Sequence, residues 1–138
     1  MNETSSRMQE IVDQINQKSS EENNGYSAEI SEAGPVVIRN SNQLGADIFM
    51  MSTDSQIITI TPLFSIDSVT ADRVNELNKL LLTITLPMAL SSFAIQDNGY
   101  VLQGSMSINT TIENVLHEID VQMANYDDAM DALDEFIV

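Results

Sequence analysis

The apolar residues at the end of the chain follow a helical period. They alternate steps of four and three residues and comprise Ile112, Leu116, Ile119, Met123, Tyr126, Met130, Leu133 and Ile137. This spacing places them on one face of a helix of roughly seven turns. Thr110 followed by Glu113 is typical of the capping box that begins such a helix.

Carboxylates form an acidic stripe along the same predicted helix. Its members are Glu113, Asp120, Asp127, Asp131 and Asp134, and no Lys or Arg follows Lys79. A symmetric two-stranded coiled coil would find no opposite charges to pair with these acids. The row on the other flank of the apolar stripe is mostly apolar, with Val115, Ala129 and Phe136. A wide apolar face favours a helix that lies flat on its own sheet, although a seam for a partner is the alternative.

Two further helices are expected upstream. Residues 1–19 form a short amphipathic helix whose apolar face comprises Met8, Ile11, Val12 and Ile15. A second helix runs from Thr70 to Pro87 and is apolar on nearly every side. Because one small sheet cannot cover it fully, its uncovered side is a candidate dimer surface. Residues 20–34 between these regions are rich in Ser, Glu, Asn and Gly, which predicts a flexible loop and a loosely attached first helix.

The remaining segments have the pattern of strands. Short β-branched or alternating runs occupy 36–38, 46–51 and 56–61, and a second hairpin turns at Asn98-Gly99. We therefore expect an α+β fold in residues 35–138. It is a two-layer sandwich in which helices cover an antiparallel sheet of about five strands, in the order α-β-β-β-α-β-β-α. The whole chain is expected to form a single domain.

Composition and charge narrow the class of partner. The chain has 138 residues, and its 43% hydrophobic and 19% charged content fits a globular domain. Its net charge of −16 repels phosphate backbones and anionic headgroups, so we expect neither nucleic-acid binding nor direct membrane insertion. The same charge favours a basic protein partner, with a solvated acidic surface as the alternative. The polar N-terminus and the shortness of the apolar run 80–90 predict a cytoplasmic location.

The sequence offers little for catalysis or metal binding. His117 is the only histidine, and an exposed helical position suits it better than acid–base or metal chemistry. The acids near the C-terminus have helical spacing and lack the glycine-centred loop that calcium requires. Cysteine is absent, and no phosphate-binding loop, nucleophile elbow or catalytic triad is present. We expect no enzyme, no metal and no cofactor.

The second half of the chain resembles a known family. The runs Tyr100–Ser107 and Thr110–Asn114, with Glu118-Ile119, resemble the YjfI-like family of uncharacterised bacterial proteins. Leu90–Phe93 also fits, whereas the Pro-Leu-Ser turn usual in the family is replaced around Ala89. That family is similar in fold to type III secretion chaperones, which are small acidic dimers that hold a partner polypeptide. The resemblance implies a phage-shock-protein-A-like protein as a candidate partner and carries over no catalytic residue.

Three hypotheses for function follow. The first is a non-catalytic chaperone-like or adaptor-like protein that holds a partner polypeptide through apolar surface rimmed by acids. The resemblance implies a homodimer for such a protein. Its candidate contact residues are Met8, Ile11, Val12, Ile15, Met50 and Met51, with ordinary core packing as the alternative for each. The second is a regulator that mimics a polyanion through the acidic stripe. The third, a small-molecule enzyme, would rest on His117 alone.

Overall fold

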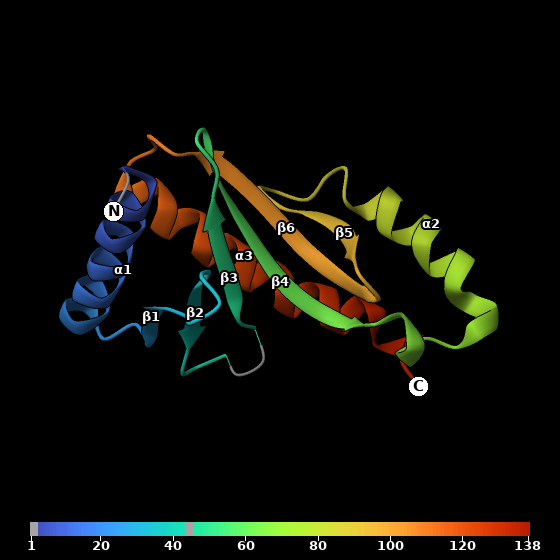
Figure 1. Ribbon diagram of the computed structural model, residues 1–138. Coiled ribbons are helices and arrows are strands. Elements are labelled where there is room, and N and C mark those ends of the chain that lie inside the picture. Colours follow the sequence, from blue (N-terminus) through green and yellow to red (C-terminus); the bar gives the residue numbers. More distant parts are fainter. Residues whose placement is uncertain (1–2, 44–45) are drawn as a thin grey trace.

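The fold is a six-stranded antiparallel sheet with helices packed on it (Figure 1). The computed structural model describes residues 3–43 and 46–138. In chain order the main elements are α1 Glu3–Glu22, β1 Tyr26–Ile30, β2 Val36–Asn40, β3 Ile48–Ser52, β4 Gln56–Ser65, α2 Val74–Ile84, β5 Ser92–Gln96, β6 Gly99–Ser107 and α3 Ile112–Leu133. The strands lie side by side in the order β1-β2-β3-β4-β6-β5. The predicted α+β class is confirmed, with six strands where about five were expected.

The additional strand lies in the segment 20–34 that was predicted to be a loop. β1 pairs antiparallel with β2, from Tyr26 opposite Asn40 to Ile30 opposite Val36. Polar residues and glycines flank this strand, and only Ala28 is buried and Tyr26 half-buried, so the strand has too short a buried pattern for a composition-based interpretation to detect. The first helix ends at Glu22, three residues later than expected, and packs against β1, so it is an integral part of the described fold (Figure 1).

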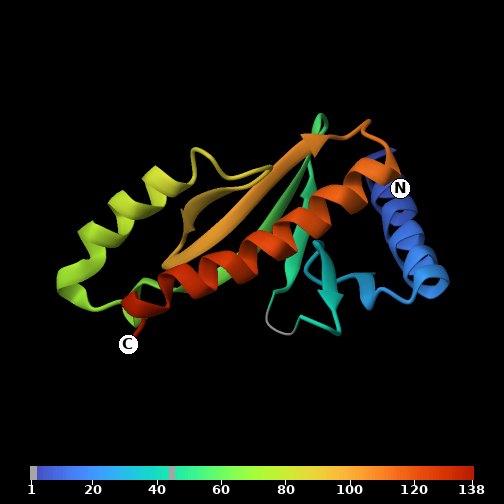
Figure 2. The same cartoon turned by 180° about the vertical axis from the view of Figure 1, so that it is seen from behind.

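The last helix crosses one face of the sheet, as the wide apolar face predicted (Figure 2). Its buried residues are Val115, Ile119, Gln122, Met123, Ala129 and Leu133. The N-cap is Thr111, whose hydroxyl accepts a hydrogen bond from the Asn114 amide at 3.1 Å. The expected pair of Thr110 and Glu113 therefore lies one residue too early. A 3₁₀ turn, Asp134–Phe136, follows the helix.

Two apolar clusters lie between the helices and the sheet. One joins α1, β1–β3 and the first half of α3, and the other joins α2, the β5–β6 hairpin and the second half of α3. Between them the buried Gln122 amide accepts a hydrogen bond from Thr59 at 2.7 Å and donates one to Thr61 at 2.8 Å. Gly104 leaves room for this group, since a Cβ there would lie 2.7 Å from the Thr59 hydroxyl oxygen.

The second hairpin turns one residue earlier than the sequence predicted. Its central residues are Asp97 and Asn98, and Asp97 has a positive φ of 54°. Asn98 is held by tertiary contacts, because its carbonyl accepts a hydrogen bond from the Ile66 amide at 2.9 Å and its side chain donates one to Asp67 at 2.9 Å. These contacts with the segment after β4 fix the position of the turn. They are tertiary contacts, so the turn preference of Asn98-Gly99 alone could not predict them.

Candidate functional site

The two edges of the sheet are treated differently. At the β1 edge, the Asn16 side chain of α1 donates a hydrogen bond to the Ala28 carbonyl and accepts one from the Ala28 amide, both at 2.9 Å. The β5 edge has no such cover over its full length. The pairing with β6 leaves the backbone groups of Phe93 and Ile95 pointing outward. Within residues 3–43 and 46–138, only the Phe93 amide has a side-chain partner there, the Thr85 hydroxyl at 3.1 Å.

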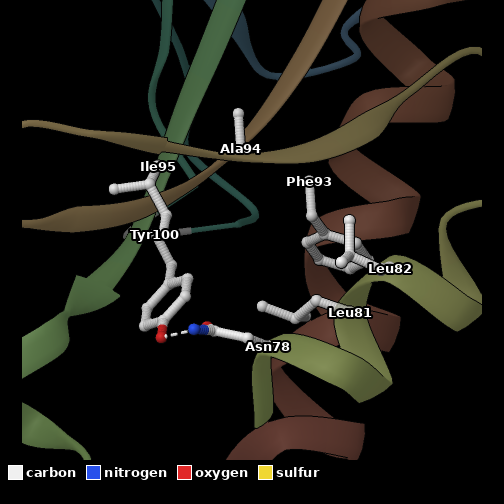
Figure 3. Close-up of a pocket in the computed structure, with 7 residues that line it drawn as sticks. All are labelled: Asn78, Leu81, Leu82, Phe93, Ala94, Ile95 and Tyr100. Atoms are coloured by element: carbon white, nitrogen blue, oxygen red, sulfur yellow. Dashed lines mark hydrogen bonds between the residues drawn. The ribbon is translucent and has the colours of Figure 1, made fainter. Parts of the chain in front are cut away.

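An apolar groove runs between α2 and this open edge (Figure 3). It has a volume of about 300 Å³ and is lined by Asn78, Leu81, Leu82, Phe93, Ala94, Ile95 and Tyr100. Leu81 and Tyr100 are buried, whereas Leu82 is 74% exposed and Ile95 is 53% exposed. Large apolar side chains left in water at the border of a groove are typical of an interaction site.

One polar pair lies within the groove. The Tyr100 hydroxyl donates a hydrogen bond to the Asn78 side-chain oxygen at 2.6 Å (Figure 3). Burial raises the pKa of Tyr100 above its ordinary value, so the phenol is neutral at physiological pH. A satisfied neutral pair gives the groove no nucleophile and no charge, and the surface suits an apolar side chain.

A second hollow lies on the other side of Phe93, which lines both. Its volume is about 380 Å³, and it lies between the segment after α2 and the second half of α3. Asp128 of α3 lines this hollow, and Asp97 lies at the hairpin turn that ends β5. Leu86 and Leu90 between α2 and β5 are exposed as well. The edge of β5 is thus an apolar surface with carboxylates near both of its ends.

The residues predicted to contact a partner lie elsewhere. Met8, Ile11, Val12, Ile15 and Met50 are buried in the first apolar cluster. Met51 is 37% exposed and lies on the opposite face of the sheet from α3. None of the six lines the groove. The same periodicity marks a helix face whether a partner or the protein's own sheet covers it, which is why the sequence left both readings open.

The acidic stripe lies at the exposed surface of α3 and the turn that follows it. Asp120 accepts a hydrogen bond from the Tyr26 hydroxyl, and Asp127 accepts one from the Gln43 side chain at 2.8 Å. Burial and the neighbouring Asp120 carboxylate raise the pKa of Tyr26 well above its ordinary value. Glu113, Asp131 and Asp134 are exposed. Since the partners of Asp120 and Asp127 are uncharged, the stripe keeps its negative field.

The surroundings of His117, the grouping of possible metal ligands and the character of the helices bear on the remaining hypotheses. His117 lies exposed on α3. Within residues 3–43 and 46–138, no group of three or more His, Cys, Asp and Glu side chains is arranged to hold a metal ion. Among the helices that the structure describes, none combines the length and apolar character needed to cross a membrane.

Comparisons with known proteins identify a family and a fold. A family model described as an uncharacterized protein conserved in bacteria matches residues 5–137. The crystal structure of YbjN from E. coli, provisionally described as a transcription regulator, aligns with a TM-score of 0.62 at 16% identity, covering 92% of this chain and 94% of that one. A chain in the crystal structure of the ExsC–ExsE complex aligns with a TM-score of 0.47 at 8% identity, covering 91% of this chain and 92% of that one. No curated protein sequence matches.

Proposed function

We propose that this chain, which belongs to the DUF2170 family of uncharacterized bacterial proteins, is a non-catalytic binding protein that holds a partner polypeptide along the free edge of β5. The observation that carries this proposal is the coincidence of an open strand edge with an apolar groove bordered by Leu82 and Ile95. An extended segment can add to such an edge as a strand and place alternate side chains in a neighbouring pocket. This is a chaperone-like or adaptor-like role.

The apolar contacts supply most of the expected affinity. Three backbone groups remain available at the edge: the Phe93 carbonyl and the amide and carbonyl of Ile95. Each hydrogen bond contributes about 0.5–1.5 kcal/mol net. Covering a large exposed side chain such as Leu82 or Ile95 contributes about 1.5–3 kcal/mol. The backbone therefore fixes the direction and register of the segment, while the groove selects its side chains.

The charges near the groove indicate the composition of the partner segment. Asp97 and Asp128 lie near opposite ends of the open edge, and the chain as a whole carries −16. A bound segment with apolar residues in the middle and Lys or Arg at its ends would match both features. The family resemblance adds a phage-shock-protein-A-like protein as a candidate for that partner.

Polyanion mimicry is the second candidate function. It would use Asp120, Asp127, Asp131 and Asp134 to occupy a basic site on another protein. The observation in its favour is that the hydrogen-bond partners of Asp120 and Asp127 are neutral, and neither carboxylate forms a salt bridge with the residues that the structure describes. Binding by this route would weaken steeply as salt rises, whereas binding in the apolar groove would change little.

The test begins with a displayed library of extended peptides. The proposal predicts that selected peptides are apolar with basic ends, and that a chosen peptide binds the wild-type chain with little dependence on salt. Ile95→Pro removes an outward amide and should abolish binding, whereas Ile95→Val keeps the amide and should retain most of it. Leu82→Glu should also abolish binding.

The controls separate the groove from the acidic stripe. Asp131→Asn combined with Asp134→Asn lowers the negative charge of α3 and leaves the groove intact, so peptide binding should persist. Equal binding by Ile95→Pro, Leu82→Glu and wild type would reject the β5 edge as the site. Loss of binding in the α3 double variant, together with a steep salt dependence, would favour polyanion mimicry instead.

A further inference from the structure

One face of the sheet is left without a helix. The helices that the structure describes pack against the other face or beyond the edges of the sheet, and the open face is turned toward the viewer in Figure 1. We call the exposed side of the four strands β3, β4, β6 and β5 the bare face. Its apolar centre comprises Phe49, Met51, Ile58, Ile60, Pro62 and Val101, of which Met51 and Pro62 are exposed, Val101 is buried and the other three are half-buried. None of these six belongs to either apolar cluster of the core.

The bare face is also uncharged. The four strands β3, β4, β6 and β5 contain no Asp, Glu, Lys or Arg, in a chain that has 21 acidic and five basic residues. Charged residues border these strands, at Asp54 and Asp97 in the hairpin turns and on β1 and β2, where Arg39 lies 3.2 Å from Glu29 and 3.6 Å from Asp47. Depletion of charge over an apolar centre distinguishes the middle of a protein interface from ordinary surface.

The geometry points to a second copy of this chain as the occupant of the bare face. Under two-fold symmetry an interface meets itself, so a face without charge makes no like-charge contact when it is duplicated. A basic partner would find no carboxylate on these four strands to pair with. The proposal is independent of the strand-addition site, which lies at the β5 edge and along α2.

A dimer formed through the bare face keeps the acidic residues of the two copies far apart. Half of the net charge lies after Thr110, in α3 and the residues that follow it, and α3 packs on the opposite face of the sheet (Figure 2). Two sheets packed face to face lie roughly 10 Å apart, and each α3 adds roughly another 10 Å. The two acidic helices are then roughly 30 Å apart, which exceeds three Debye lengths of about 8 Å at physiological salt.

The size of the bare face predicts a weak dimer. The four strands have five, ten, nine and five residues. With about 3.3 Å per residue and about 4.8 Å between strands, their footprint is roughly 450 Å². A standard interface buries about 800 Å² per partner. We therefore expect a dimer that dissociates on dilution and that tightens as salt screens the residual repulsion between the subunits.

Sedimentation equilibrium of the full chain over a wide concentration range tests the proposal. The wild-type mass should rise from 15.2 kDa toward twice that value, and more so at high salt. Ile60→Glu places a charge in the middle of the bare face and should leave a monomer at every concentration. Leu86→Glu is the matched control, because Leu86 is 88% exposed outside the bare face and its replacement should leave the dimer intact.

A second variant guards against misfolding of the first. Gln103 lies opposite Ile60 on β6, and Gln103→Glu adds a charge there without removing an apolar side chain. It should weaken the dimer at least tenfold while the circular dichroism spectrum is unchanged. A wild-type chain that is monomeric throughout would overturn the proposal. A dimer lost in Leu86→Glu but retained in Ile60→Glu and Gln103→Glu would also overturn it, by placing the interface at α2.

Discussion

The side chain of Asn16 substitutes for a neighbouring strand at Ala28. It donates to the carbonyl and accepts from the amide of the same residue, both at 2.9 Å, which is the pair of bonds that an antiparallel strand would make. A helix side chain thereby covers this edge of the sheet at Ala28. The contrast with the open groups of Ile95 explains why strand addition is proposed at β5 and not at β1.

Asn16→Ala should open the β1 edge. The variant loses two hydrogen bonds, and the free energy of unfolding should fall by about 1–2 kcal/mol. Urea denaturation followed by circular dichroism measures this change. Gln17→Ala is the control, because the Gln17 side chain bonds only to the exposed Glu21 of the same helix. Equal stability of the two variants would show that the Asn16 bonds contribute nothing measurable.

Gly104→Ala should destabilise the fold through overlap. A Cβ at this position would lie 2.7 Å from the Thr59 hydroxyl oxygen and 2.9 Å from the Gln122 side-chain oxygen. The buried hydrogen bonds between the two apolar clusters would have to shift, at an expected cost of about 1–3 kcal/mol.

Gly99→Ala is the matched control for this prediction. A Cβ there meets its nearest neighbour at 3.6 Å, an ordinary contact, and the residue has no positive φ. Thermal unfolding of both variants should therefore show a lowered midpoint for Gly104→Ala and little change for Gly99→Ala. A normal midpoint in both would mean that Thr59 and Gln122 relax freely.

Stability at acid pH should depend on Arg73 and Glu76. Arg73 lies 3.0 Å from Glu76 and 4.1 Å from the centre of the Phe136 ring, so it links the start of α2 to the C-terminal turn. The hydrogen bond and charge of Arg73 lower the pKa of Glu76 below its ordinary value. The folded state therefore binds this proton less readily than the unfolded chain, and the stabilisation is lost as pH falls through the lowered pKa.

Measurement of the unfolding midpoint from neutral to acid pH checks this sign. Glu76→Gln should flatten the acid limb of the curve relative to wild type. Lys79 lies on the same helix and has no recorded carboxylate partner among the described residues, so Lys79→Gln should leave the acid limb unchanged. An identical acid limb in wild type and Glu76→Gln would contradict the prediction.

The tyrosines should ionise at higher pH in the folded chain than in the unfolded chain. Burial is the main cause that raises the pKa of Tyr26, Tyr100 and Tyr126, and Asp120 adds to the effect at Tyr26. The fold therefore favours protonated tyrosine, and this contribution to stability is lost as pH rises above the ordinary tyrosine value of about 10. In a pH titration, phenolate absorbance should appear at higher pH in the native chain than in urea. Tyr26→Phe should remove the component that ionises at the highest pH.

Periodicity predicted the helices better than it predicted the edges of the sheet. The apolar row of α3 and the alternation of β6 each repeat often enough to mark a buried face. β1 buries only Ala28 fully and Tyr26 in part, between polar flanks and glycines, so its signal is too short. Asn16 closes this strand from twelve residues away in the sequence, a contact that no local pattern reports.

The candidate site was harder to predict for a related reason. In the sequence, Leu82 did not differ from the other apolar residues of a helix that was expected to be buried. Ile95 did not differ from the other residues of its strand. Only the tertiary placement of α2 beside β5 leaves both exposed around a groove. The residues that were predicted to contact a partner, on the first helix and at Met50 and Met51, have the same pattern, but the fold covers all of them except Met51.

The cover that Asn16 provides at Ala28 of β1 also limits how these molecules can polymerise. Fibrous growth by strand exchange requires each newly added unit to present a fresh receptive edge to the next. Here a unit joined at β5 would present β1, and the Asn16 amide already occupies the backbone groups of Ala28. A further chain that adds to β1 would have to displace Asn16 from Ala28, and this requirement disfavours amyloid-like growth of an acidic protein that has an apolar strand edge at β5.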